Sequence, residues 1–232
     1  MLDSTNLLWY STIAVQFLFC LHLIWTRLAR DYRVFTAYLG YSVIRDLAAI
    51  YFMQGAVGRR LPLTYTYFWL WTEPPLLLLQ VALAWEVHQK MWNSHRDVLR
   101  QTRPVLVFAL LAALAGAAIP LRSEALHGGA STLLLVRHFG IQSTRYISSV
   151  LAIFLVLSAV LYVAVVDNGR AHSIVRHEGM LATYFGIYAI AAFWISSGWA
   201  LADFVNGYFL SAITLCFIAW FSAFRPLPLP NE

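Results

Sequence analysis

Three ionisable residues lie inside otherwise apolar stretches of this sequence, where a charge is most costly to bury. Arg45 and Asp46 fall within the stretch 34–54, and Glu73 falls within the stretch 65–86. Each costs roughly 2.5 to 3.5 kcal/mol near the centre of a lipid bilayer on insertion scales. Such residues mark either a polar contact that fixes two helices together or a ligand site inside the membrane.

Arg45 and Glu73 are predicted to meet. With a rise of ~1.5 Å per residue, Arg45 lies about 16 Å above the inner end of its helix. Glu73 lies about 18 Å above the inner boundary of a hydrocarbon core that is ~30 Å thick. Opposite charges at matching depth on consecutive antiparallel helices can pair, which removes most of the cost of inserting either one. Asp46 is rotated by ~100° from Arg45, so the two cannot point in the same direction, and Asp46 is expected to accept a hydrogen bond from Ser42 or from another helix.

The helix that carries Glu73 also contains Pro74 and Pro75. Prolines remove helical hydrogen bonds and disfavour helical geometry in the residue before them, so we expect this helix to kink or break. A new helix would then begin with amides that attract anionic groups. Thr66, Glu73 and Gln80 recur every seven residues and share one face, which is expected to point toward protein or water.

Two interpretations of this interior group stay open. The first is a structural polar clamp that fixes helix register, and the second is a ligand or ion site near the middle of the membrane. Arg145, near the outer end of a later helix, would rim an opening to such a site, or would simply extend toward lipid headgroups.

A second group of ionisable residues is expected near the inner ends of the helices. Three histidines and two glutamates suit zinc or iron, and two of these histidines could face each other across a haem. Because no HExxH, HxxxH or ExxH spacing places two ligands on one helix face, the favoured interpretation is side chains that face water or headgroups. The five residues are His22, Glu86, His88, His177 and Glu178, with His22 and His177 as the haem pair.

Retinal is excluded as a cofactor. A retinal protein needs a Schiff-base lysine inside the bilayer. The only lysine, Lys90, falls in a predicted connection.

The composition identifies a membrane protein. Of 232 residues, 60% are apolar and only 12% are charged, whereas an ordinary globular domain has roughly 25% charged residues. At half that share, too little polar surface remains to coat a soluble particle. The net charge of +5 comes from residues strung between apolar stretches, a distribution that disfavours nucleic-acid binding and favours loops that flank a membrane.

Seven apolar stretches are long enough, at about 20 residues, to cross a bilayer. We therefore predict an all-α, polytopic transmembrane bundle of seven helices that forms a single domain over 1–232. The fourth stretch is short and rich in alanine, which favours close packing against neighbours. The predicted spans are 7–26, 34–54, 65–86, 104–120, 144–166, 179–199 and 204–224.

Arginine and lysine accumulate on the cytoplasmic side of membrane proteins. Ten of them fall on one side of the predicted spans and three on the other, which places the N-terminus outside and the C-terminus inside. The arginine bias of the basic residues is typical of a GC-rich bacterial genome, so we expect the bacterial inner membrane. The two sets are Arg27, Arg30, Arg33, Lys90, Arg96, Arg100, Arg103, Arg170, Arg176 and Arg225 on the inside, and Arg59, Arg60 and Arg122 on the outside.

The third and sixth stretches also carry a family resemblance. An aromatic run at 67–72 precedes Glu73, and Glu86 ends the same span. Together with Arg145 and the stretch 177–188, this pattern resembles uncharacterised seven-helix membrane proteins of soil bacteria. The resemblance covers most of the chain and implies a seven-helix fold but no activity. Pro74, Pro75 and Gln80 depart from the pattern.

Three functions follow as hypotheses. The first is binding or passage of a small polar or anionic solute, with Arg45 as the binding charge and Glu73 as its partner. The second is a non-catalytic subunit that packs on another membrane protein or on further copies of itself. The third is a metal-dependent membrane enzyme built on the inner histidines and glutamates.

Overall fold

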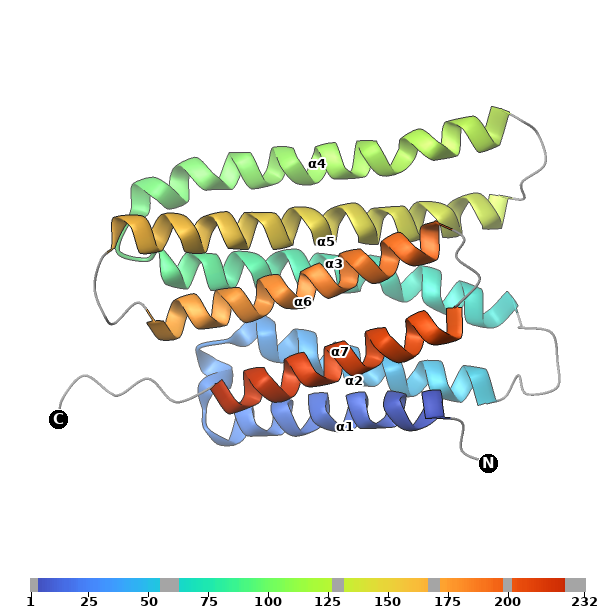
Figure 1. Ribbon diagram of the computed structural model, residues 1–232, viewed down its shortest axis with the longest axis horizontal. Helices are drawn as coiled ribbons and strands as arrows, with labels where there is room; N and C mark the ends of the chain where they lie inside the picture. Colours follow the sequence, from blue (N-terminus) through green and yellow to red (C-terminus); the bar gives the residue numbers. More distant parts are fainter. Residues whose placement is uncertain (1–3, 55–62, 127–131, 167–171, 198–201, 224–232) are drawn as a thin grey trace.

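The computed structural model describes residues 4–54, 63–126, 132–166, 172–197 and 202–223 (Figure 1). These residues form seven α-helices and one short 3-10 helix, η1, and they contain no strand, so the predicted all-α class is confirmed. The elements are α1 (Ser4–Trp25), η1 (Leu28–Arg30), α2 (Arg33–Gln54), α3 (Leu63–Met91), α4 (Arg96–Leu126), α5 (Thr132–Val165), α6 (His172–Ser196) and α7 (Ala202–Ala223).

The seven α-helices lie side by side along the long axis of the molecule, and consecutive helices run in opposite directions (Figure 1). As a result α3 and α5 run parallel to each other. The helix α3 packs on α2, α5 and α6, whereas α4 lies at one edge of the bundle and packs on α5. The polar residues of α3 therefore face three neighbouring helices.

The core beside α3 is built from aromatic rings on α1, α2, α6 and α7. Phe35 stacks on Trp220 with ring centroids 4.5 Å apart, and Phe19 meets Phe35 edge-on at 5.3 Å. Tyr184 packs against Phe217 at 5.5 Å. All five rings are almost completely buried. Offset and edge-on pairs of this kind add to the stability that burial gives, and they hold the four helices in a fixed arrangement.

The outer surface of the bundle is strongly apolar. Large side chains such as Phe108 and Ile119 on α4 and Leu157 and Val160 on α5 are exposed. Within the described residues, four helices are long and apolar enough to cross a membrane. A surface of this kind fits a lipid environment, in which backbone groups are satisfied within each helix. The four segments are Leu7–Trp25, Arg96–Pro120, Thr132–Val165 and Val175–Ser196.

Two helices extend well beyond the spans expected from the sequence. The helix α4 runs through Pro104 and Pro120, which bounded the predicted span, and α5 begins at Thr132 rather than near residue 144. The 34 residues of α5 give a helix about 51 Å long at ~1.5 Å per residue. The helices therefore project beyond a ~30 Å hydrocarbon layer, and residues expected in connections are largely helical.

Of the kink or break predicted in α3, the break is wrong. The helix runs without interruption from Leu63 to Met91, with Pro74 and Pro75 inside it. Each proline removes one amide donor, and the turns on either side keep theirs. No new helix begins after Glu73, so the expected anion-attracting amides are absent at this point of α3.

Candidate functional site

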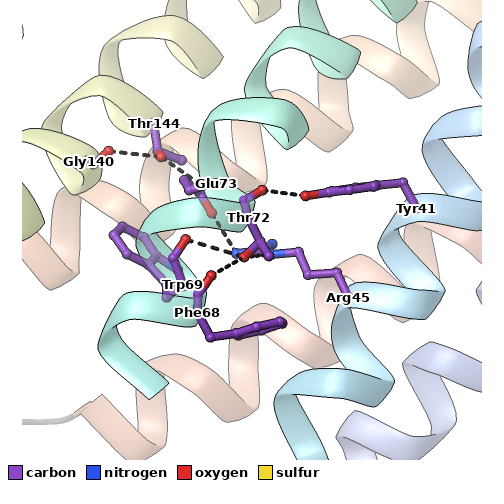
Figure 2. A network of polar contacts seen from close by, with 8 residues as sticks. All are labelled: Tyr41, Arg45, Phe68, Trp69, Thr72, Glu73, Gly140 and Thr144. Carbon is purple, nitrogen blue, oxygen red and sulfur yellow. Dashed lines mark hydrogen bonds and ion pairs between the residues drawn. The ribbon is translucent and has the colours of Figure 1, made fainter. Parts of the chain in front are cut away.

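The predicted contact between Arg45 and Glu73 is confirmed. Arg45 on α2 places Nη2 2.6 Å from Oε2 of Glu73 on α3 (Figure 2). The two side chains are 14% and 7% exposed. A short, charge-assisted hydrogen bond is what two buried opposite charges require, because a lone charge would carry the full cost of desolvation.

Hydroxyl groups complete the coordination of this ion pair. Thr144 on α5 donates to Oε1 of Glu73 at 2.8 Å, and Nε of Arg45 donates to Oγ1 of Thr72 at 3.2 Å. The Thr72 hydroxyl in turn donates to the Phe68 carbonyl at 2.8 Å. Both carboxylate oxygens therefore have a donor. We call Arg45, Thr72, Glu73 and Thr144 the charge cluster; it joins α2, α3 and α5 (Figure 2).

Two further contacts bring these helices together at the same level. Tyr41 on α2 donates its hydroxyl hydrogen to the Thr72 carbonyl at 2.8 Å. Gly140 on α5 faces Trp69 on α3, and a Cβ atom at Gly140 would lie 2.9 Å from the indole ring. The missing side chain lets α3 and α5 approach closely enough for Thr144 to reach Glu73, as small residues do at membrane helix interfaces.

Several buried polar groups near the charge cluster have no hydrogen-bond partner among the described residues. They are both side-chain amide atoms of Gln80, Oε1 of Gln142, and the hydroxyls of Ser143 and Ser148. Glu73 and Gln80 are both buried, as the predicted polar stripe requires; the side chain of Thr66 lies outside the described part. A buried polar atom without a partner costs about 1 to 3 kcal/mol. Such atoms mark positions where water or a polar solute binds.

A tyrosine group continues the polar interior from the charge cluster. The hydroxyls of Tyr38 on α2 and Tyr184 on α6 are hydrogen-bonded to each other, and the Tyr188 ring lies 4.8 Å from that of Tyr184. Tyr188 is an electrostatic neighbour of Tyr38, and the Gln80 side chain interacts with the Tyr38 hydroxyl. Asp46 is half-buried and interacts electrostatically with Arg45, Glu73 and Tyr188, so it lies in the same electrostatic surroundings as Arg45.

Arg145 does not join the charge cluster, although it follows Thr144 in the sequence. Its guanidinium carbon lies 4.5 Å from the ring centroid of Phe193 and 5.3 Å from that of Tyr146. Its Nη1 also donates to Ser196 Oγ at 3.5 Å. These cation–π and polar contacts attach α5 to the end of α6.

A second polar group, which sequence reasoning did not assemble, lies further along α3. Nδ1 of His88 is 2.8 Å from Ser158 Oγ on α5, and Nε2 is 2.9 Å from Thr102 Oγ1 on α4. Trp92 Nε1 donates to Ser158 Oγ at 3.0 Å. Oε1 of Glu178 on α6 lies 4.0 Å from His88 Nδ1. We call His88, Trp92, Thr102, Ser158 and Glu178 the histidine cluster. The sequence signal for the hydroxyls of Thr102 and Ser158 is weak: each lies near or within an apolar stretch.

The five residues considered as metal ligands separate into different roles. Only His88 and Glu178 approach each other. His177 accepts a hydrogen bond from Trp220 Nε1 at 3.2 Å, and His22 packs on the Phe221 ring at 4.8 Å. Within the described ranges, no three His, Cys, Asp or Glu side chains converge on a position for a metal ion.

Glu86 has a structural position instead. Its two carboxylate oxygens accept hydrogen bonds from the backbone amides of Val34 and Phe35, at 3.2 and 3.1 Å. These amides belong to the first turn of α2, where no helical carbonyl is available to accept from them. A carboxylate at this position also interacts favourably with the helix dipole. Glu86 therefore caps α2 from the end of α3.

Lys90, one turn further along α3, contacts the connection between α1 and α2. Its Nζ donates to the Asp31 carbonyl and lies 3.4 Å above the centre of the Tyr32 ring. Burial lowers the pKa of the Lys90 ammonium, while Glu86 and Asp31 act to raise it. Burial, with the negative charges of Asp31 and Glu86, raises the pKa of the Tyr32 hydroxyl. Lys90 thus holds the connection between α1 and α2 against α3.

Comparisons with protein-family models, curated proteins and solved structures gave no match to this chain.

Proposed function

We propose that this chain is a multi-pass protein of the bacterial inner membrane that binds or passes a small polar or anionic solute. All seven α-helices would span the membrane, with the N-terminus outside and the C-terminus inside. This orientation is inferred from the excess of basic residues on one side of the spans. Of the thirteen basic residues counted on the two sides, four lie outside the described part of the chain: Arg59 and Arg60 on the outer side, and Arg170 and Arg225 on the inner side.

The observation that supports a solute site is the set of unsatisfied polar atoms beside the charge cluster. Gln80 lies seven residues along α3 from Glu73, a separation of about 10 Å, and Ser148 lies one turn along α5 from Thr144. The side chains of Gln80 and Ser148 are completely buried, yet their polar atoms have no hydrogen bond of good geometry among the described residues, and Gln80 has only the Tyr38 hydroxyl as a polar neighbour on α2. A bundle that served only to hold helices together would gain stability from apolar residues at these positions.

Arg45 is the residue that would select an anion. A guanidinium binds a carboxylate or a similar oxyanion through paired N–H donors. Arg45 uses Nε and Nη2 for Thr72 and Glu73. An anion would compete with Glu73 for the guanidinium, while Glu73 would keep its hydrogen bond from Thr144.

The experiment compares wild-type protein with Arg45→Gln in lipid vesicles. Stopped-flow light scattering would follow the entry of acetate, nitrate, urea and glycerol into the vesicles, with Arg145→Gln as a matched control. Arg145 is a neighbouring arginine that contacts α6 rather than the charge cluster. We expect faster entry of at least one anionic probe with wild type and with Arg145→Gln, and loss of that entry with Arg45→Gln.

The structural-clamp interpretation gives a different set of results. If no probe enters faster than in protein-free vesicles, and Arg45→Gln fails to assemble, then the ion pair serves only to hold α2, α3 and α5. A folded Arg45→Gln protein with unchanged entry of every probe would also overturn the proposal.

A second candidate is a non-catalytic subunit of a membrane complex, with α4 as the contact helix. Within its segment Arg96–Pro120, only 17% of the residues in the most apolar stretch are buried in the bundle, the lowest share among the four apolar segments. Ala113 and Ala117 pack inward, whereas Ala112 and Ala115 are exposed. Small exposed residues allow another helix to approach closely. Purification in mild detergent as a stable monomer would remove this candidate, and co-purification of a defined partner or a homo-oligomer would support it.

A further inference from the structure

Glu178 is a completely buried carboxyl group whose oxygens make no hydrogen bond of good geometry, although Ser158 is a polar neighbour. Its relative exposure is 0%, and neither Oε1 nor Oε2 has a hydrogen-bond partner among the described residues. Its nearest ionisable neighbour is His88, with Oε1 and Nδ1 4.0 Å apart. An ionised carboxylate in this position would be a buried charge without a donor, which is among the most costly arrangements in a protein.

The hydrogen bonds around His88 determine where its protons lie. Thr102 donates its hydroxyl hydrogen to the Val98 carbonyl at 2.9 Å, which leaves its oxygen to accept from His88 at Nε2. Ser158 accepts from Trp92 Nε1, which leaves its own hydrogen to donate to His88 at Nδ1. We assign His88 as the neutral tautomer with hydrogen on Nε2, the form that fits both hydroxyls. In this state Nδ1 offers Glu178 no proton.

A carboxylate at Glu178 would face a lone pair on Nδ1 of His88. One additional proton removes this repulsion, and it can bind to either group. On Glu178 it makes the carboxyl group neutral beside a neutral His88. On Nδ1 of His88 it makes an imidazolium that pairs with the Glu178 carboxylate. Both arrangements have zero net charge, whereas removal of the proton leaves a single negative charge in an apolar interior. A buried pair of this kind shares its proton rather than titrating as two separate groups.

We propose that His88, Ser158 and Glu178 form a binding site for one proton, which exchanges between the Glu178 carboxyl group and Nδ1 of His88. In the exchange, the O–H bond of Glu178 breaks as a bond forms from that hydrogen to Ser158 Oγ. The Ser158 hydroxyl simultaneously gives its own hydrogen to Nδ1. Ser158 is placed for this step because it contacts His88 and lies beside Glu178. The site is separate from the solute site and does not depend on it.

The surrounding charges do not supply an alternative partner for Glu178. On α3, Glu86 binds the first turn of α2 and Lys90 binds the Asp31 carbonyl. On α6, His177 binds Trp220, and Arg176 is exposed. The neighbouring α5 contributes the neutral Ser158. On the α3–α4 corner, His95 packs on Trp92, and the charged side chains of α4 at this level are exposed: Asp97, Arg100 and Arg103.

A route for protons leads from the edge of the bundle to His88. Thr102 is half-buried, whereas His88 and Glu178 are completely buried. The hydrogen-bonded series Thr102, His88, Ser158 therefore extends from the edge of α4 to Glu178. Hydroxyl and imidazole groups in series can both accept and donate protons.

Infrared spectroscopy of the full chain in lipid vesicles tests the site, because a protonated carboxyl group has a C=O stretching band that a carboxylate lacks. The decisive variant is His88→Gln, in which the carboxyl group is the only remaining place for the proton. We expect this band in His88→Gln at neutral pH and its loss in His88→Gln combined with Glu178→Gln. Glu86→Gln is the matched control, since Glu86 accepts two backbone hydrogen bonds and should contribute no such band.

The wild-type protein and Ser158→Ala test the exchange. In wild type we expect either the C=O band of protonated Glu178 in the infrared spectrum or a doubly protonated His88 in the nitrogen NMR spectrum. The C=O band should shift to lower frequency when the sample is transferred to D2O. Ser158→Ala should slow that shift. If Glu178→Gln does not assemble, Glu178→Asp should move the band rather than abolish it. The absence of a Glu178-dependent band in His88→Gln overturns the proton site, and a band that never shifts in D2O overturns the exchange.

Discussion

The charge cluster and the histidine cluster both contain residues of α3 and α5, but their buried carboxylates are neutralised in different ways. In the charge cluster both oxygens of Glu73 accept a hydrogen bond, one from Arg45 and one from Thr144. In the histidine cluster neither oxygen of Glu178 has a hydrogen-bond partner among the described residues. Glu73 has the permanent cation of Arg45 beside it. Glu178 instead lies beside His88, whose Nδ1 lone pair already accepts a hydrogen bond from Ser158.

The difference follows from the residue that each carboxylate faces. Arginine stays protonated in proteins, so it fixes a neighbouring carboxylate in its charged form. Histidine gains or loses a proton near neutral pH, so a carboxylate beside it can share one. Because α3 and α5 run parallel, each cluster obtains a hydroxyl from α5: Thr144 for Glu73 and Ser158 for His88. The clusters lie about 22 Å apart along α3.

The largest effect is expected from breaking the charge cluster on one side. Glu73→Ala leaves the buried Arg45 without its counter-ion, and we expect the free energy of unfolding in detergent micelles to fall by about 3 to 5 kcal/mol. The double variant Arg45→Met with Glu73→Leu removes both charges and should recover most of that loss. Equilibrium unfolding of the single and double variants measures both effects.

A smaller loss from Glu73→Ala, equal to that of a neutral hydrogen bond, would show that water already solvates the pair. In that case hydration, rather than the permanent cation, would distinguish Glu73 from Glu178, which is completely buried.

The second prediction concerns the hydroxyl that α5 contributes to Glu73. Thr144→Val keeps the shape of the side chain and removes the hydrogen bond to Oε1. We expect a loss of about 2 kcal/mol, typical of a hydrogen bond to a charged group. Ser148→Ala is the matched control on the same helix, because its hydroxyl has no described partner, and it should be neutral or stabilising. Equal losses from the two variants would contradict the assignment.

The all-helical class and the ion pair were predictable from the sequence for the same reason. Apolar stretches of about 20 residues predict helices without reference to their neighbours. Arg45 and Glu73 are opposite charges at matching depth on consecutive helices, so the antiparallel connection alone brings them together. The supporting role of Thr144 was not predictable, because α3 and α5 are not consecutive and the rotation of α5 depends on the close approach at Gly140.

Two other expectations show where sequence reasoning was insufficient. The prolines at 74 and 75 predicted a kink or a break, and the break is wrong: α3 stays helical with neighbouring helices packed on three sides. The histidines and glutamates near the inner ends were considered as one group because of their similar depth. Depth does not specify direction: Glu86 turns toward α2, His177 toward α7, and only His88 and Glu178 turn toward each other.

The third prediction tests whether the approach of α3 and α5 serves the charge cluster. Gly140→Ala would place a Cβ atom 2.9 Å from the Trp69 ring, so the ring or the helix must shift. We expect a loss of about 1 kcal/mol, at the low end for overpacking because a ring edge can move. Combining Gly140→Ala with Trp69→Leu should reduce that loss. Gly116→Ala on α4 is the control, since a Cβ atom there meets nothing within 4 Å.

The smallest loss of stability is expected from Glu178→Gln. The amide keeps the size of the protonated carboxyl group and needs no counter-ion, so its replacement of Glu178 should change the free energy of unfolding by less than about 1 kcal/mol, or raise it. The same substitution at Glu73 should destabilise the protein, because Arg45 needs a negative charge. Unfolding of Glu178→Gln and Glu73→Gln under identical conditions separates the clusters directly. A comparable loss in both variants would mean that Glu178 is ionised and paired, and would place it in the same class as Glu73.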